Sequence, residues 1–176
     1  SVGAAIAAKY WLEETGAAGT IRLYGTPAEE GGSGKVYLVR EGLFDDVDVA
    51  LHWHASGSNT AAALTSLANR SAKFRFHGLS QHAARAPEKA RSALDGVEAF
   101  NHMVNLMREH VPQEMRIHYV ITNGGLAPNV VPDFAEVYYY VRHPEAAIVN
   151  EVWARLEDAA EGAALGTGIR VEAEII

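Results

Sequence analysis

The 176 residues predict two regions of different fold class: a partial parallel α/β segment over 1–66, then a complete α+β domain over 67–176. In the first region, helical segments alternate with short apolar runs, as in a parallel sheet covered by helices. In the second, the segments follow the order β-α-β-β-α-β, which is the split-βαβ or ferredoxin-like motif. With 48% hydrophobic and 21% charged residues, the chain has the composition of a folded protein.

The first region begins with a predicted helix over 2–14. An apolar run over 20–24 predicts a strand, and a second run over 47–53 predicts a buried strand. Between them, a helix is predicted over about 34–41, ending at Gly42. A parallel sheet with helices on both faces needs more chain than this, so we expect only part of such a domain.

The second region alternates between the two periodicities of an α+β domain. Apolar residues recur at every second position where a strand is predicted, and at helical spacing where a helix is predicted. The predicted strands cover 72–78, 115–121, 134–141 and 169–175, and the predicted helices cover 90–107 and 145–161. All parts of the motif are present, so we expect a complete domain.

The composition also excludes several classes of partner. A formal charge of −7 argues against nucleic acid and against an anionic membrane surface. The sequence has no apolar run of membrane-spanning length, and it does not open with a secretory signal. The chain has no cysteine, so a transition-metal site would use histidine and carboxylate ligands. We therefore expect a cytoplasmic protein.

Two adjacent acids, Glu29 and Glu30, lie in a Gly-rich turn directly after the apolar run 21–24. Like charges held together repel each other, and a bound cation removes that cost. The cation would take one carboxylate as a ligand and leave the other to hold a proton for catalysis. An adjacent Glu pair is also common on ordinary solvated surface, so the residues alone leave both interpretations open.

His52 and His54 lie at the end of the predicted strand 47–53. Residues two apart on a strand share a face, and neutral imidazole is a good zinc ligand. Either residue is equally well explained as a core histidine bonded to the backbone. His54 is nearer the following loop and is the better candidate.

Three further polar residues are candidates in the second region. His82 lies on the predicted loop after the first strand, where it can donate a hydrogen bond to a developing oxyanion. Asn129 and Arg142 bracket the third predicted strand, and arginine binds a carboxylate through two parallel hydrogen bonds. The alternatives are a solvated loop histidine and an arginine in a salt bridge on the sheet.

Together these pieces resemble the zinc-dependent aminoacylase and glutamate-carboxypeptidase superfamily of metallo-amidohydrolases, and most closely its branch of B-type aminobenzoyl-glutamate utilisation proteins. The resemblance extends over essentially the whole chain. The segments that carry it are Pro27–Glu30, Asp48–His54, Gly78–Ala83 and Asn129–Asp133, with Arg142 beyond them.

The resemblance implies an enzyme that hydrolyses an amide bond to a carboxylate-bearing group, such as N-acyl or aminobenzoyl glutamate. It implies that Glu29 is the general base that deprotonates a metal-bound water, and that Glu30 and His54 are metal ligands, with His52 as the second choice. The implied cofactor is a divalent metal, zinc or else manganese. On this basis residues 1–66 are part of the metal-binding catalytic domain.

The resemblance also implies that residues 67–176 form the family's lid and dimerisation domain. His82 would reach into the site of the partner subunit and steady the oxyanion, while Asn129 and Arg142 would bind the substrate, Arg142 through its carboxylate. We therefore expect a homodimer or a hetero-oligomer formed through this domain, acting on a small-molecule amide.

One departure from the family affects the expected activity. Family members supply further metal ligands from segments before and after the part that this chain matches, so we expect an internal fragment with little or no activity alone. The alternative is a non-catalytic oligomerisation or ligand-binding module, because the predicted ferredoxin-like domain has two edge strands that can pair with a partner.

Overall fold

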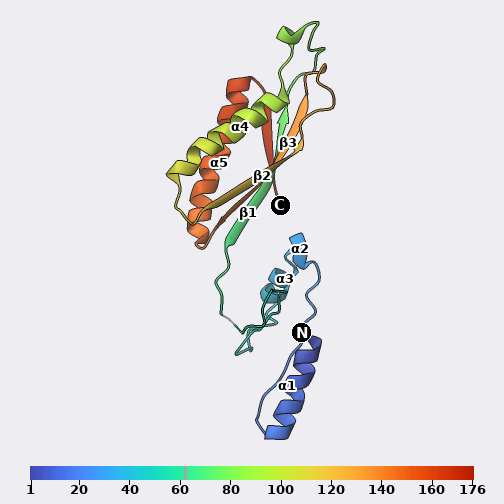
Figure 1. Ribbon diagram of the computed structural model, residues 1–176, viewed down its shortest axis with the longest axis vertical. Coiled ribbons are helices and arrows are strands. Elements are labelled where there is room, and N and C mark those ends of the chain that lie inside the picture. The colour runs from blue at the N-terminus through green and yellow to red at the C-terminus, as the bar shows by residue number, and fades with distance from the viewer. Residues whose placement is uncertain (62) are drawn as a thin grey trace. The chain divides into compact units, whose positions relative to one another are not determined.

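The computed structural model describes residues 1–61 and 63–176 and divides into two units, Ser1–Ala62 and Ala63–Ile176, called unit 1 and unit 2 below (Figure 1). Among the described residues, no helix is both long enough and apolar enough to cross a membrane. The assignment of 1–66 to a catalytic domain and of 67–176 to a lid concerns function, and it stays a prediction.

Unit 2 combines helices with an antiparallel sheet, which confirms the predicted mixture of the two. The four strands lie in the order β2-β3-β1-β4, and each neighbouring pair is antiparallel. The main elements are β1 (Ala68–His77), α4 (Ala93–Met107), β2 (Arg116–Asn123), β3 (Phe134–His143), α5 (Ala146–Thr167) and β4 (Arg170–Ile175). Two short 3-10 helices, η1 (Pro87–Lys89) and η2 (Arg108–His110), flank α4.

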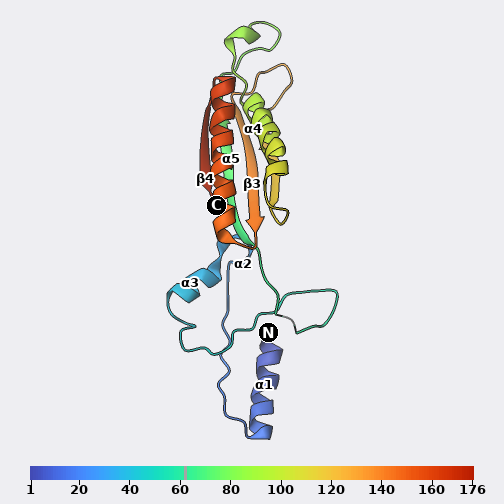
Figure 2. The ribbon, with the colours of Figure 1, turned by 90° about the vertical axis from the view of Figure 1, so that its left-hand side faces the viewer.

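Helices α4 and α5 lie on the same face of the sheet (Figure 2). The alternation of the strands points Phe74 and Tyr139 toward the helices, where Phe100 of α4 and Trp153 of α5 meet them, and all four side chains are buried. The buried Tyr139 hydroxyl donates a hydrogen bond to Asn101 Oδ1 at 2.5 Å. The core of unit 2 is therefore closed on the helical side, with its buried phenol hydrogen-bonded.

The opposite face of the sheet is covered by neither helix of unit 2 and carries polar side chains, and we call it the open face. Its central group is Glu136, which accepts hydrogen bonds from Arg75 at 2.8 Å and from Thr122 at 2.7 Å. Arg75 also pairs with Glu174 on β4, and Lys73 lies 3.8 Å from Glu136. This network ties all four strands together on the side that the helices leave uncovered.

Unit 1 departs from its prediction. Its described residues, 1–61, form the helices α1 (Val2–Thr15), α2 (Glu29–Gly32) and α3 (Gly34–Arg40), and they form no strand. The helices predicted over 2–14 and about 34–41 are confirmed. The strands predicted over 20–24 and 47–53 are wrong, and with them the parallel α/β layer within these residues.

The exposure of the apolar side chains gives the physical reason. Leu23, Val49 and Leu51 have exposed fractions of 52%, 70% and 92%. A parallel strand is stable where neighbouring strands take its hydrogen bonds and helices cover both faces, and residues 1–61 supply neither. The contacts that do form are local, such as the Arg22–Asp46 ion pair at 2.5 Å and the hydrogen bond from Tyr24 to the Leu43 carbonyl at 2.8 Å.

Candidate functional site

The loops that follow β1 and precede β3 are joined by backbone hydrogen bonds. Gly78 N–H donates to the Asp133 carbonyl at 2.8 Å, and Ala83 N–H donates to the Asn129 carbonyl at 3.0 Å. Between these two bonds, His82 forms an isolated antiparallel bridge with Val130. The predicted candidates His82 and Asn129 therefore lie together on one pair of loops, although they are far apart in sequence.

A glycine allows this loop pair to form. A Cβ atom at Gly78 would lie 2.0 Å from the Arg91 carbonyl oxygen and 2.9 Å from the Ala93 nitrogen. No side chain fits in that space, so only glycine lets the chain leave β1 so close to the start of α4. Position 78 thus fixes where the loop carrying His82 begins.

The hydrogen bonding of His82 defines which of its ring nitrogens can act as a donor. The Ala84 N–H donates to His82 Nδ1 at 3.2 Å, so Nδ1 uses its lone pair as an acceptor. A neutral imidazole with an accepting Nδ1 carries its proton on Nε2. Because the His82 side chain is exposed, its Nε2–H is available to a ligand.

A hollow lies beside this loop pair. Its volume is about 590 Å³, and its lining is largely apolar, including Pro87, Leu94, Pro128 and Pro132. Ser92 and Asp95 are the polar side chains of its wall, and Ser92 also caps α4 by accepting a hydrogen bond from Asp95 N–H at 3.1 Å. Ser92, Leu94 and Asp95 of its wall thus belong to the N-terminal end of α4, which Ser92 caps.

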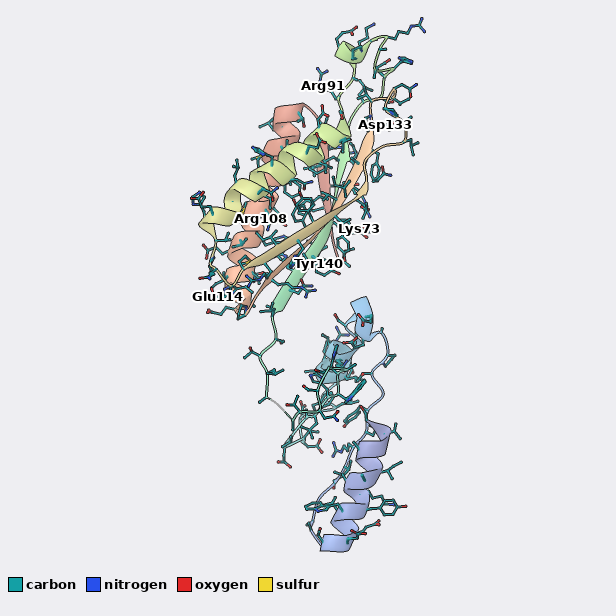
Figure 3. The ribbon with its side chains drawn as sticks, in the orientation of Figure 1. Lys73, Arg91, Arg108, Glu114, Asp133 and Tyr140 are labelled. Atoms are coloured by element: carbon teal, nitrogen blue, oxygen red, sulfur yellow. The ribbon has the colours of Figure 1, made fainter. Side chains whose placement is uncertain are left out.

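Arg142 lies at the other end of β3. Asp133, just before β3, and Glu114, just before β2, mark the two ends of the sheet (Figure 3). Arg142 pairs with Arg116 at the first position of β2, so it belongs to the Glu114 end, about 26 Å along β3 from Phe134 at the end near Asn129. Within one copy, the structure brings His82 and Asn129 together and leaves Arg142 apart.

Arg142 is held on the open face by an aromatic neighbour. Its guanidinium carbon lies 5.2 Å from the centre of the Tyr140 ring, within the range of a cation–π contact. The Tyr140 hydroxyl is 3.1 Å from that of Tyr138, and this hydrogen bond raises the pKa of Tyr140. Tyr140 therefore stays neutral at physiological pH and offers Arg142 a polar, uncharged neighbour.

Glu29 and Glu30 are in unit 1, on the predicted turn. Both side chains are exposed, and Ala28 before them has a φ of 54°, which is a left-handed conformation. Glu30 has an extended ψ of 102° although it falls inside the short helix α2. The two carboxylates thus stand on an irregular turn.

His52 and His54 are also exposed, and they lie in a segment without regular structure. His54 Nδ1 lies 2.9 Å from the Ala55 carbonyl oxygen. A carbonyl oxygen only accepts, so in the neutral ring Nδ1 carries the proton and Nε2 keeps its lone pair. His54 thus has the tautomer of a metal ligand, opposite to that of His82, although the described residues contain no cluster of three histidine, aspartate or glutamate side chains.

Two polar neighbours of Arg142 were not among the predicted site residues. Asn69 on β1 and Arg116 on β2 are its direct cross-strand partners. Their sequence positions, at or near a strand end, give no sign of this, because the register in which two strands pair cannot be read from the periodicity of one sequence. The available signal was a basic residue, Arg116, at the second position of the predicted strand 115–121.

Comparison with known proteins gives a consistent result. The chain is 50% identical over 170 residues to one of the subunits of the p-aminobenzoyl-glutamate hydrolase of Escherichia coli K12, covering 96% of this chain and 35% of that protein. It is 34% identical over 175 residues to the Xaa-Arg dipeptidase of Mus musculus, covering 98% and 40%. The chain thus spans little more than a third of the length of these relatives.

A solved structure supports the fold. The aminobenzoyl-glutamate utilization protein of Klebsiella pneumoniae superimposes with a TM-score of 0.54 at 24% identity, over 62% of this chain and 28% of that one. The family match is specific to unit 2, where residues 68–167 match the peptidase dimerisation domain. The chain therefore belongs to the M20 family of peptidase dimerisation domains.

Proposed function

We propose that this chain is part of a metal-dependent amidohydrolase that cleaves an amide bond to a carboxylate-bearing group, such as N-acyl or aminobenzoyl glutamate. Membership of a peptidase dimerisation family and two relatives named as a hydrolase and a dipeptidase support this proposal. The longer enzyme that would contain the chain is called the full-length protein below. We place it in the cytoplasm, in keeping with a chain that has no cysteine.

The observation that carries the proposal is the loop pair that holds His82 beside Asn129. Attack of water on an amide carbonyl creates a negative charge on the carbonyl oxygen. A preorganised N–H donor aimed at that oxygen lowers the barrier. The Nε2–H of His82 is such a donor, since Ala84 already occupies Nδ1.

The remaining chemistry is assigned to three other residues. Glu29 takes a proton from the attacking water as the C–O bond forms, and it returns that proton to the leaving amine as the C–N bond breaks. Asn129 and Arg142 bind the substrate, with the Arg142 guanidinium on a carboxylate. The exposed position of both Glu29 and Arg142 leaves their charged groups accessible.

The proposed cofactor is a divalent metal, zinc or manganese, with Glu30 and His54 among its ligands and His52 as the second choice. Carboxylate and imidazole are suitable donors, and the free Nε2 of His54 agrees with this role. These ligands are too few for a metal site, because the described residues contain no group of three histidine, aspartate or glutamate side chains that could hold a metal ion. The site is thus incomplete within this part of the chain.

A dimer would unite the two halves of the substrate site. We assign unit 2 to the ferredoxin-like arrangement, in which β2 is an edge strand, and Tyr119, Val120 and Ile121 of this strand have exposed fractions of 38–55%. If two copies pair through β2 about a two-fold axis, the strands run antiparallel. His82 of the partner subunit then lies at the same end of the joined sheet as Arg142.

The test is a mixed dimer of the full-length protein. Co-expressed H82A and R142M chains each lack one half of the site. With His82 supplied in trans, one site of each mixed dimer is intact, so a statistical mixture recovers about a quarter of wild-type turnover. Activity no greater than that of either variant alone would refute the arrangement.

A second candidate is an oligomerisation module without catalysis. The observation that favours it is the match of residues 68–167 to a dimerisation domain, which by itself requires no chemistry. This candidate predicts that the full-length protein forms a homodimer or a hetero-oligomer. It also predicts that the protein binds no divalent metal and does not hydrolyse aminobenzoyl glutamate. Dimerisation alone decides nothing, since both candidates include it.

A further inference from the structure

Two arginines lie directly opposite each other on neighbouring strands. Arg116 of β2 is the cross-strand partner of Arg142 of β3. The following pair, Ile117 and Val141, is buried beneath the helices, so the two arginines share the open face. Like charges directly opposite on adjacent strands destabilise a sheet, so an anion between them would be favourable.

The charges elsewhere on the open face are compensated. Arg75 pairs with Glu136 and Glu174, and Arg170 lies 3.7 Å from Glu172. Among the ion pairs of residues 1–61 and 63–176, none includes Arg116 or Arg142. At the Arg142 end of the sheet, two positive charges therefore lie side by side, and neither is in an ion pair with a carboxylate of the described residues.

The local contacts hold both guanidinium groups while leaving donors free. Arg116 uses Nη1 for hydrogen bonds to the carbonyls of Gln113 at 2.7 Å and Met115 at 2.9 Å. Its Nε and Nη2 remain, and the fork of a guanidinium matches a carboxylate in two parallel hydrogen bonds. Arg142 is steadied by the Tyr140 ring rather than by an acid, so its donors are also available.

We propose that Arg116 is a second carboxylate-binding residue beside Arg142, and that the pair selects amides of a dicarboxylic amino acid such as glutamate. This inference rests on the proposed function, in which Arg142 binds the first carboxylate. Each carboxylate of the substrate takes one guanidinium, and both positive charges are then matched. An amide of a neutral amino acid leaves Arg116 without an anionic partner and binds less tightly.

The kinetic test compares two substrates of the full-length protein, p-aminobenzoyl-glutamate and p-aminobenzoyl-glutamine. In R116Q, KM for the glutamate substrate rises about 10- to 100-fold with little change in kcat, because a charge-assisted hydrogen-bond pair is lost. For the glutamine substrate, KM changes less than about threefold. In R116K, KM for the glutamate substrate lies between the wild-type and R116Q values. The matched control R170Q, on the same face, has wild-type KM for both substrates.

A binding test on the chain itself separates failure of this inference from failure of the proposed function. The dicarboxylate glutarate and the monocarboxylate butyrate are titrated while the arginine Nε–H signals are followed by NMR. Glutarate binding that R116Q abolishes supports the site, even if the full-length protein hydrolyses neither amide. No glutarate binding, binding unchanged in R116Q, or equal kinetic losses on both substrates would overturn it.

Discussion

Trp53 in unit 1 and Trp153 in unit 2 differ greatly in how far they are buried. Trp153 in α5 has no exposed surface, and its ring contacts Phe74 while its N–H donates to Glu157 at 2.7 Å. Trp53 in unit 1 is 73% exposed. Apolar runs alone do not make a core, because a strand or helix becomes stable only where another element covers its apolar side.

The same contrast applies to the candidate site. His82 and Asn129 are positioned by backbone hydrogen bonds on a domain with a closed core, which is the condition for a preorganised site. Glu29, Glu30 and His54 lie on exposed segments. The candidate residues of unit 2 are thus held in place by the fold, whereas those of unit 1 lie on exposed segments with few neighbours.

The largest expected effect concerns this division of roles. In the full-length protein, E29Q should lower kcat by about 10²- to 10⁴-fold, because the amide of glutamine cannot accept the proton of water. Since Glu29 is exposed, the urea midpoint of unfolding should not change. Steady-state hydrolysis of p-aminobenzoyl-glutamate and urea denaturation measure the two quantities on the same preparations.

The matched control for this prediction is E14Q, which removes an exposed acid of α1 in the same unit. It should leave kcat unchanged. A near-normal kcat in E29Q would remove Glu29 from the mechanism. A fall in kcat accompanied by an equal fall in stability would make its role structural instead.

The two tryptophans provide the second prediction. W153A should lower the free energy of unfolding of the chain by about 3–5 kcal/mol, because it leaves a cavity between Phe74 and the helices. W53A should change it by less than about 0.5 kcal/mol, since the ring is mostly in solvent. Urea unfolding followed by far-ultraviolet circular dichroism measures both without relying on tryptophan fluorescence.

If W153A does not fold, the milder W153F keeps the comparison testable. A loss of about 1–2 kcal/mol is expected for it, because a smaller ring still fills part of the site. Equal losses for the two positions would mean that unit 1 has a core that its exposed side chains do not indicate.

The sequence predicted unit 2 well because its signals are local and mutually consistent. The alternation that ends in Tyr139 and the helical spacing that includes Phe100 both identify residues that are buried. In unit 1 the helices over 2–14 and about 34–41 were equally local and were predicted correctly. The strands over 20–24 and 47–53 were not, because a strand is completed by hydrogen bonds from neighbours that a local pattern does not contain.

The candidate site shows the same limit. His82 and Asn129 could be singled out by residue type and loop position, but their proximity depends on loops that meet only in the folded domain. The separation of Arg142 from Asn129 follows from the length of β3, and it agrees with their predicted positions on either side of this strand. Its pairing with Arg116 depends on a register between strands, which sequence periodicity leaves undetermined.

The smallest expected effect concerns the charged network around Glu136 on the open face of unit 2. Partial burial tends to raise the pKa of Glu136, but the hydrogen bonds from Thr122 and Arg75 and the charge of Lys73 outweigh it and lower the pKa below its ordinary 4.5. The folded state therefore favours the charged carboxylate. Its stabilisation is complete above the pKa of the unfolded chain and is lost as the pH falls through the lower folded pKa.

Replacing this residue should accordingly have a pH-dependent cost. At pH 7, E136Q should lower the free energy of unfolding by about 1 kcal/mol, because the charge-assisted bonds to Arg75 weaken. Below pH 4 the difference from wild type should shrink, as the wild-type carboxylate also becomes protonated. Urea unfolding at pH 7 and at pH 3.5 measures the change, with E98Q on the exposed side of α4 as the control. If the stability difference between E136Q and wild type is the same at both pH values, Glu136 acts through its shape and not through its charge. The open face would then be stabilised by packing, as the core is.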